Sequence, residues 1–161
     1  MNIFYKPNIG IEFSNKIISW NTNREMVRKI LNSDYECGDF ELDNSEFFNG
    51  DKSYNIISKR DIYKNISNEI CLIFFNYDEN EKLDAIEIHN GVKLQIGENQ
   101  FDFSQNIDEI SRMIGNESAE IEKGNIIFKK FKMNISSAKY MGGDSEKLGY
   151  IFLSRDEIIN E

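Results

Sequence analysis

The sequence predicts an α+β fold, an antiparallel sheet with two short helices on one face. Three observations lead to this class. Several short runs alternate apolar and polar residues, as half-buried strands do. Residues 22–32 and 106–114 instead repeat their apolar residues at helical spacing. Turn signals, including Asn90-Gly91, separate the strand candidates closely enough for hairpins.

The strongest strand signal lies in residues 69–89. Residues 70–75 are an unbroken apolar run rich in β-branched and aromatic types, which favours a strand buried on both faces. Residues 78–82 are polar and suit a hairpin loop. In residues 83–89 the alternation directs Ile86 and Ile88 to one face, and Glu87 and His89 to the other. The Asn90-Gly91 turn then predicts residues 92–96 as the third strand of a meander.

Upstream, residues 9–13 and 17–20 are short strand candidates. Thr22 and Glu25 form a capping box, so a helix is expected over residues 22–32. Polar residues dominate 33–53, where we expect an irregular excursion with one strand near 39–42. Residues 54–57 are another strand candidate, and 61–65 are ambiguous.

Downstream, residues 101–103 are a strand candidate that precedes the second helix. Asn106 and Glu109 repeat the capping pattern of that helix, and Gly115 supplies its stop. Residues 126–135 are expected to form one long strand, and residues 136–147 a polar loop. A closing strand is predicted over residues 148–153.

The two helical segments resemble each other. Thr22, Glu25 and Ile30 align with Asn106, Glu109 and Ile114 at a constant offset of 84. Strands precede and follow each helix in the same order. The sequence therefore predicts a tandem strand-helix-strand-strand duplication within a single domain, residues 1–161, with pseudo-repeats over 9–89 and 90–154.

The chain is acidic, with a formal net charge of -9. This charge argues against direct binding to nucleic acid or to an anionic membrane, and it permits a basic protein partner. Neither a signal peptide nor an apolar stretch of membrane-spanning length is evident, so we expect the cytoplasm. There, reduced thiols are favoured for Cys37 and Cys71, although a disulfide stays open.

The sequence indicates no catalytic residue, no metal site and no cofactor. His89 is the only histidine, and it forms no zinc-ligand spacing with Cys37 or Cys71. The loop at 78–82 lacks the glycine and terminal glutamate of a calcium-binding EF-hand. Glu87 and His89 share a strand face, for which an ordinary solvated surface and a binding surface both stay open.

Three short matches carry a family resemblance: Tyr77-Asp78, Lys82-Leu83 and Ala85-Ile86-Glu87, followed by residues 101–103 leading into the second helix. In this order of elements, residues 9–116 resemble small bacterial immunity proteins of polymorphic or contact-dependent toxin systems. The resemblance implies a non-enzymatic cytoplasmic protein that binds a cognate toxin domain and blocks it. Many such toxins are basic nucleases, which an acidic inhibitor suits.

On this hypothesis, acidic residues in loops and on the sheet face, with two tyrosines as anchors, are the partner-binding candidates. They are Asp78, Glu79, Glu81, Glu87, Tyr140, Asp144, Glu146 and Tyr150. Two other classes stay open. One is a structural or regulatory binding module that forms homo-oligomers, and the other is an enzyme of unrecognised type.

Overall fold

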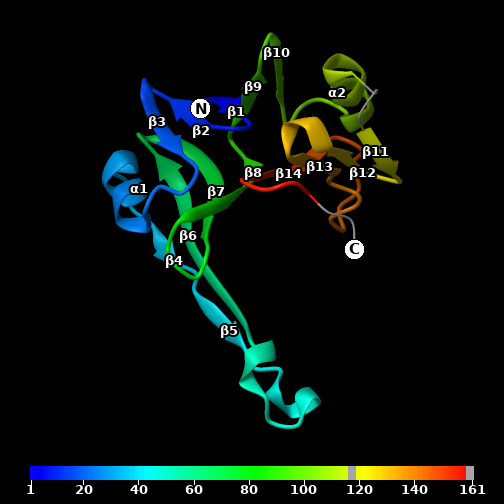
Figure 1. Cartoon of the computed structure of the whole chain (residues 1–161). Helices are drawn as coiled ribbons and strands as arrows, with labels where there is room; N and C mark the ends of the chain where they lie inside the picture. Colours follow the sequence, from blue (N-terminus) through cyan, green and yellow to red (C-terminus); the bar gives the residue numbers. More distant parts are fainter. Residues whose placement is uncertain (116–118, 159–161) are drawn as a thin grey trace.

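The computed structural model describes residues 1–115 and 119–158 (Figure 1). It confirms the α+β class, with antiparallel-rich sheets and two short helices, α1 (Arg24–Leu31) and α2 (Ile107–Ile114). The described strands form two sheets. The smaller sheet contains β1 (Asn2–Lys6), β2 (Gly10–Phe13), β3 (Lys16–Ser19), β9 (Lys93–Ile96) and β10 (Asn99–Asp102). The larger sheet contains β4 (Glu36–Cys37), β5 (Phe40–Leu42), β6 (Ile56–Ile66), β7 (Glu69–Tyr77), β8 (Leu83–Asn90), β11 (Ala119–Glu122), β12 (Asn125–Phe128), β13 (Met133–Ser137) and β14 (Leu148–Ser154).

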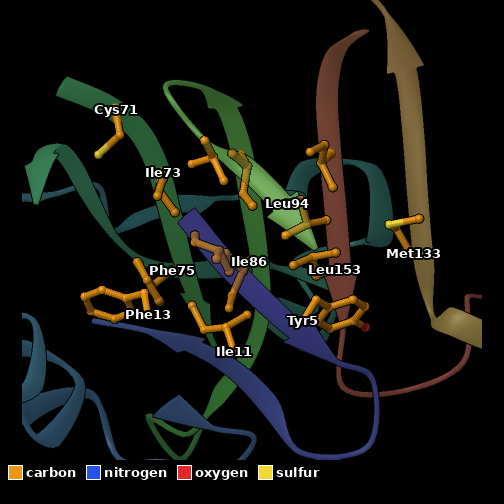
Figure 2. Close-up of a cluster of buried hydrophobic side chains, with 14 of the residues drawn as sticks. Tyr5, Ile11, Phe13, Cys71, Ile73, Phe75, Ile86, Leu94, Met133 and Leu153 are labelled. Carbon is orange, nitrogen blue, oxygen red and sulfur yellow. The ribbon is translucent and has the colours of Figure 1, made fainter. Parts of the chain in front are cut away.

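The core lies between the two sheets. Figure 2 shows Tyr5, Ile11 and Phe13 of the smaller sheet pointing towards side chains of the larger one. The facing residues, among them Phe75 and Ile86, are fully buried. Val27 of α1 and Ile110 of α2 belong to the same buried cluster. Strand alternation and helix periodicity thus direct apolar side chains to one shared interior, whose burial drives folding.

The predicted hairpin over residues 69–89 is confirmed as β7 and β8. One detail of the prediction is wrong, because β7 is buried on one face rather than both. Ile73 and Phe75 are buried, whereas Ile70 is 81% exposed. The second face of β7, which bears Phe74 and Asn76, is only partly buried. An unbroken apolar run in the sequence therefore does not mean that both faces of the strand are buried.

The predicted meander is wrong, because the chain changes sheets at Asn90-Gly91. Strand β9 does not pair with β8. It pairs in parallel with β1 and antiparallel with β10. Gly91 makes the crossing with a φ of 74°, and a Cβ there would lie 2.2 Å from the carbonyl oxygen of Ile70. Leaving β8 in this way brings Leu94 into the core between the sheets.

The cap residue of α1 differs from the prediction, whereas that of α2 agrees with it. Asn23, and not Thr22, caps α1, because its side chain accepts the amide hydrogen of Glu25 at 3.0 Å. The Thr22 hydroxyl instead donates to the carbonyl oxygen of Ser19. Asn106 caps α2 in the same way, through the amide of Asp108. Equivalent residues of the two helices are therefore 83 apart, not 84.

The same offset relates other elements of the two halves. The hairpin of β2 and β3 corresponds to that of β9 and β10 at 83 residues. Each cap residue forms an isolated bridge with a lysine, Asn23 with Lys82 and Asn106 with Lys147. Between the halves, β8 and β14 pair antiparallel, with Ile88 opposite Ile151 and Ile86 opposite Leu153. This pairing has approximate two-fold symmetry; the duplication itself stays a prediction.

Three further strand assignments needed correction. The predicted strand over residues 126–135 is two strands, β12 and β13, separated by the 3₁₀ turn Lys129–Phe131 and by Lys132 in the left-handed region. Residues 56–66 form the single strand β6, where the sequence suggested separate candidates. Strand β1 was not predicted, and its partner β9 lies about ninety residues away, beyond local patterns.

Candidate functional site

The most exposed apolar surface of the described chain lies on an arm, residues 40–58. The arm consists of β5, two 3₁₀ turns (Ser45–Phe48 and Lys52–Tyr54) and the first residues of β6. It projects from one end of the larger sheet, away from the rest of the molecule (Figure 1). Its exposed large apolar residues are Phe40, Leu42, Phe47, Phe48, Tyr54, Ile56 and Ile57. Phe47 is 82% exposed, so burial within this chain does not explain it.

The arm is ordered by contacts among its own residues. Asp43 and Asp51 accept the amide hydrogens of Ser45 and Ser53, each at 2.9 Å, and so begin the two turns. The rings of Phe48 and Tyr54 stack at 4.0 Å between centroids, with planes 12° apart. These contacts fix the tip in one conformation while its aromatic side chains remain exposed. A preordered tip loses little entropy on binding.

At its root, the arm is fastened to α1 through Asp39. The guanidinium of Arg24 donates to both carboxylate oxygens of Asp39, at 2.8 and 2.7 Å. The amide of Arg60 donates to the same carboxylate at 2.9 Å. Hydrogen bonds from Arg24, with a smaller one from the backbone, lower the pKa of Asp39 to about 2. The root is therefore held by an ionised, two-point contact.

The same arginine continues into a buried ion network. Arg24 is 3% exposed and donates to Asp61, which is fully buried. Arg28 donates to both oxygens of Asp61 at 2.8 Å, and the Tyr77 hydroxyl donates at 3.3 Å. Burial opposes ionisation of Asp61, but the hydrogen bonds from Arg28 and Arg24 outweigh it and lower the pKa of Asp61. The network is closed and structural, since every member has a partner.

The arm is also strongly acidic. Residues 40–58 contain four carboxylates and a single cation, Lys52. The carboxylates are those of Glu41, Asp43, Glu46 and Asp51. Hydrogen bonds from Ser45 lower the pKa of Asp43, and those from Ser53 lower the pKa of Asp51. These carboxylates are thus ionised at neutral pH. The arm thus carries exposed aromatic side chains together with an excess of negative charge.

The structure places three of the predicted site residues beside the arm root, at the β7–β8 loop. Asp78 is neutralised by Arg155 at 3.0 Å and accepts two loop amides, so it shapes the loop. The Glu81 carboxylate is 3.7 Å from Nζ of Lys59, which also donates to the Glu79 carbonyl oxygen. Of these three residues only Glu79 is exposed, and it forms no ion pair with another described residue.

Two predicted residues, Glu87 and Tyr150, come together on the outer face of the larger sheet. Glu87 accepts a hydrogen bond from Nδ2 of Asn76 at 2.7 Å and lies 3.6 Å from Nε2 of His89. Burial opposes ionisation, but the neighbouring His89 and the hydrogen bond from Asn76 lower the pKa of Glu87. The His89 ring packs between Phe74 and Tyr150. The cluster is half-buried and offers less apolar area than the arm.

The remaining predicted residues, Tyr140, Asp144 and Glu146, lie in the β13–β14 loop beside α2. All three are exposed, and Glu146 pairs with Lys139 at 2.8 Å. This loop corresponds to the β7–β8 loop of the first half. The two helices lie at opposite edges of the smaller sheet, α1 beside β3 and α2 beside β10 (Figure 1). The eight predicted residues therefore fall on three separate surfaces.

The sequence did not indicate the arm as a site, because its apolar residues stand within a stretch that polar residues dominate. They include Phe40, Leu42, Phe47 and Phe48. Aromatic residues in such a stretch could signal either anchors in the core or an exposed surface. The Asp and Asn residues at both turns are the pattern that could have indicated the arm. Such residues order a turn through local hydrogen bonds, without contacts to the core.

Within the described residues, no group of three or more acidic, histidine or cysteine side chains is arranged to hold a metal ion. Nor does any described helix have the length and apolarity needed to cross a membrane. Both cysteines are free, Cys71 buried and Cys37 exposed. Comparison of the chain with protein-family models, with curated proteins and with solved structures found no match.

Proposed function

We propose that this chain is a non-enzymatic cytoplasmic protein that binds another protein through the arm, and that its partner is a toxin domain with a basic surface. The observation that carries the proposal is the arm, an ordered projection whose aromatic tip is exposed. Large exposed apolar patches on soluble proteins mark interaction surfaces, and aromatic residues dominate their binding energy.

The charge of the arm supports the choice of partner. The arm contains four carboxylates and one lysine, and the chain as a whole carries a net charge of -9. A partner with an apolar pocket and a rim of lysine or arginine side chains would complement both features. The resemblance to immunity proteins adds the biological class, in which the bound protein is a toxin, often a basic nuclease.

The test is a pull-down from the protein's own host with tagged wild type and two variants. Phe47→Ser removes the most exposed aromatic of the tip. Ile70→Ser is the matched control, because Ile70 is equally exposed, at 81%, but lies on the body. We expect one basic protein in stoichiometric amounts with the wild type and with Ile70→Ser, and its loss with Phe47→Ser.

The captured protein must then be toxic or enzymatically active by itself, and inhibited by added wild-type chain. Equal recovery with Phe47→Ser would overturn the arm as the binding element. Recovery of only the tagged chain itself would instead support the homo-oligomeric alternative.

A further inference from the structure

The arm has a second feature besides its tip, an open backbone edge. Strand β6 pairs with β7 on one side, and on the other with β5 and, only at Asp61 and Ile62, with β4. Its pairing with β7 begins only at Lys59, which lies opposite Tyr77. Residues 56–58 pair with β5 on one side. Among the described residues, no strand pairs with their other side.

This edge is short and is followed directly by Lys59, but its first two residues are apolar and exposed. Soluble proteins protect such edges with lysine, proline or a bulge, because unpaired backbone groups attract other strands. Residues 56 and 57 are both isoleucine, with Ile57 66% exposed, and neither a charge nor a proline interrupts them. An exposed apolar edge on a projecting arm is consistent with an edge that becomes covered when a partner binds.

Building on the function proposed above, we propose that the toxin partner adds an extended, basic segment as a β-strand along residues 56–58. The added strand would continue the line of β7, which ends at Tyr77. Its end would therefore meet the β7–β8 loop, where Glu79 is exposed and Glu81 lies nearby. On the opposite side of β6, Glu41 is paired with Ile57.

These charges decide between the two strands that could occupy the edge. A second copy of this chain would place two acidic arms, each with four carboxylates and one lysine, side by side. Residues 56–58 carry no charge, so the repulsion would come from the two arms as a whole, and a basic partner would not meet it. The edge therefore fits a strand of a heterologous protein that carries lysine or arginine.

Hydrogen exchange on the complex formed with the captured toxin tests the proposal. The Gly38 amide donates to the Arg60 carbonyl oxygen, so by alternation residues 56 and 58 hydrogen-bond towards β5 and the amide of Ile57 faces the open edge. We expect the Ile57 amide to become protected on binding, and the amides of β3, an edge strand of the other sheet, to remain unchanged. The variant Ile57→Lys places a charge on the edge and should weaken binding about tenfold or more, as loss of a central interface contact does. The matched control is Ile17→Lys, at an exposed isoleucine of β3.

The outcomes separate this inference from the proposed function. Loss of binding with Phe47→Ser, without protection of the Ile57 amide and without an effect of Ile57→Lys, would overturn the added strand and leave the arm as the binding element. Hydrogen exchange of free Ile57→Lys shows whether the arm still folds. A concentration-dependent dimer in sedimentation velocity that Ile57→Lys abolishes would assign the edge to a second copy, against the proposal.

Discussion

The two halves of the chain build the same hairpin in different ways. In the second half, β11 and β12 are joined by Lys123 and Gly124 alone, with Glu122 paired to Asn125. In the first half, the arm separates β4 from the body of β6. The fold needs only the short turn at this position. The arm is therefore an addition to the fold, and its exposed aromatics are free to serve binding.

A second difference accompanies the arm. Ile107 of α2 occupies the place of Arg24 in α1, and both side chains are buried. In the register of the larger sheet, Asp61 lies opposite Phe75, which lies opposite Ile86. In the second half, Ile126 lies opposite Ile135, which lies opposite Ile151. Asp61 thus stands where the second half has Ile126. The first half therefore has a buried ion network where the second half has apolar packing. The same Arg24 also binds Asp39 at the arm root.

The largest effect should come from breaking this network. Asp61→Ala leaves Arg24 and Arg28 without the buried carboxylate that they share, and we expect a loss of about 3–5 kcal/mol of unfolding free energy. Urea denaturation followed by circular dichroism measures it. The control is Asp84→Ala, which removes an exposed pair with Arg155 and should cost at most about 1 kcal/mol.

The double variant Arg24→Met with Asp61→Leu sharpens the comparison. It gives the first half the apolar packing of the second, so it should be less destabilised than Asp61→Ala. A double variant as unstable as the single one would show that the two halves are not interchangeable at this place.

Acid should release the arm root next. The pKa of Asp39 in the folded chain, about 2, lies below that of an unfolded aspartate, near 3.9. Its contribution to stability is therefore complete above about pH 4 and is lost as the pH falls towards 2. We expect unfolding free energy to decline over that window, and less steeply in Asp39→Asn. An unchanged slope in Asp39→Asn would contradict a role for this carboxylate.

The two caps should behave alike. Asn23→Ala and Asn106→Ala each remove a side chain that accepts an amide hydrogen two residues on, and each should cost about 1 kcal/mol. Equal shifts in the urea midpoint are expected. A loss from only one substitution would show that the corresponding helix ends differ energetically.

Replacing the tip of the arm with the short turn of the second half should change unfolding free energy least. Leu42 is paired with Ile56, so replacing residues 43–55 with Lys-Gly closes the hairpin as in the second half. Because the deleted aromatics are exposed, unfolding free energy should change by no more than about 1 kcal/mol. Thermal unfolding checks this, and the shortened chain should no longer capture the partner. A loss of several kcal/mol would show that the tip contributes to the core.

Local patterns alone settled much of the fold. Alternation placed Ile86 and Ile88 in the core, helical spacing located α1 and α2, and polar residues marked the β7–β8 loop. Each of these depends on residues within a few positions of one another, where burial of one face selects the period. The α+β class follows from the same signals.

Tertiary structure decided what local patterns leave open. Asn90-Gly91 predicts a turn, but only the pairing of β9 with the distant β1 makes that turn a change of sheet. Arg24 reads as an ordinary residue on a helix surface until Asp61 and Asp39 approach it from other strands. Likewise, Phe47 and Ile57 could belong to a core or to a surface. Their exposure depends on where the arm extends, and long-range packing sets that direction.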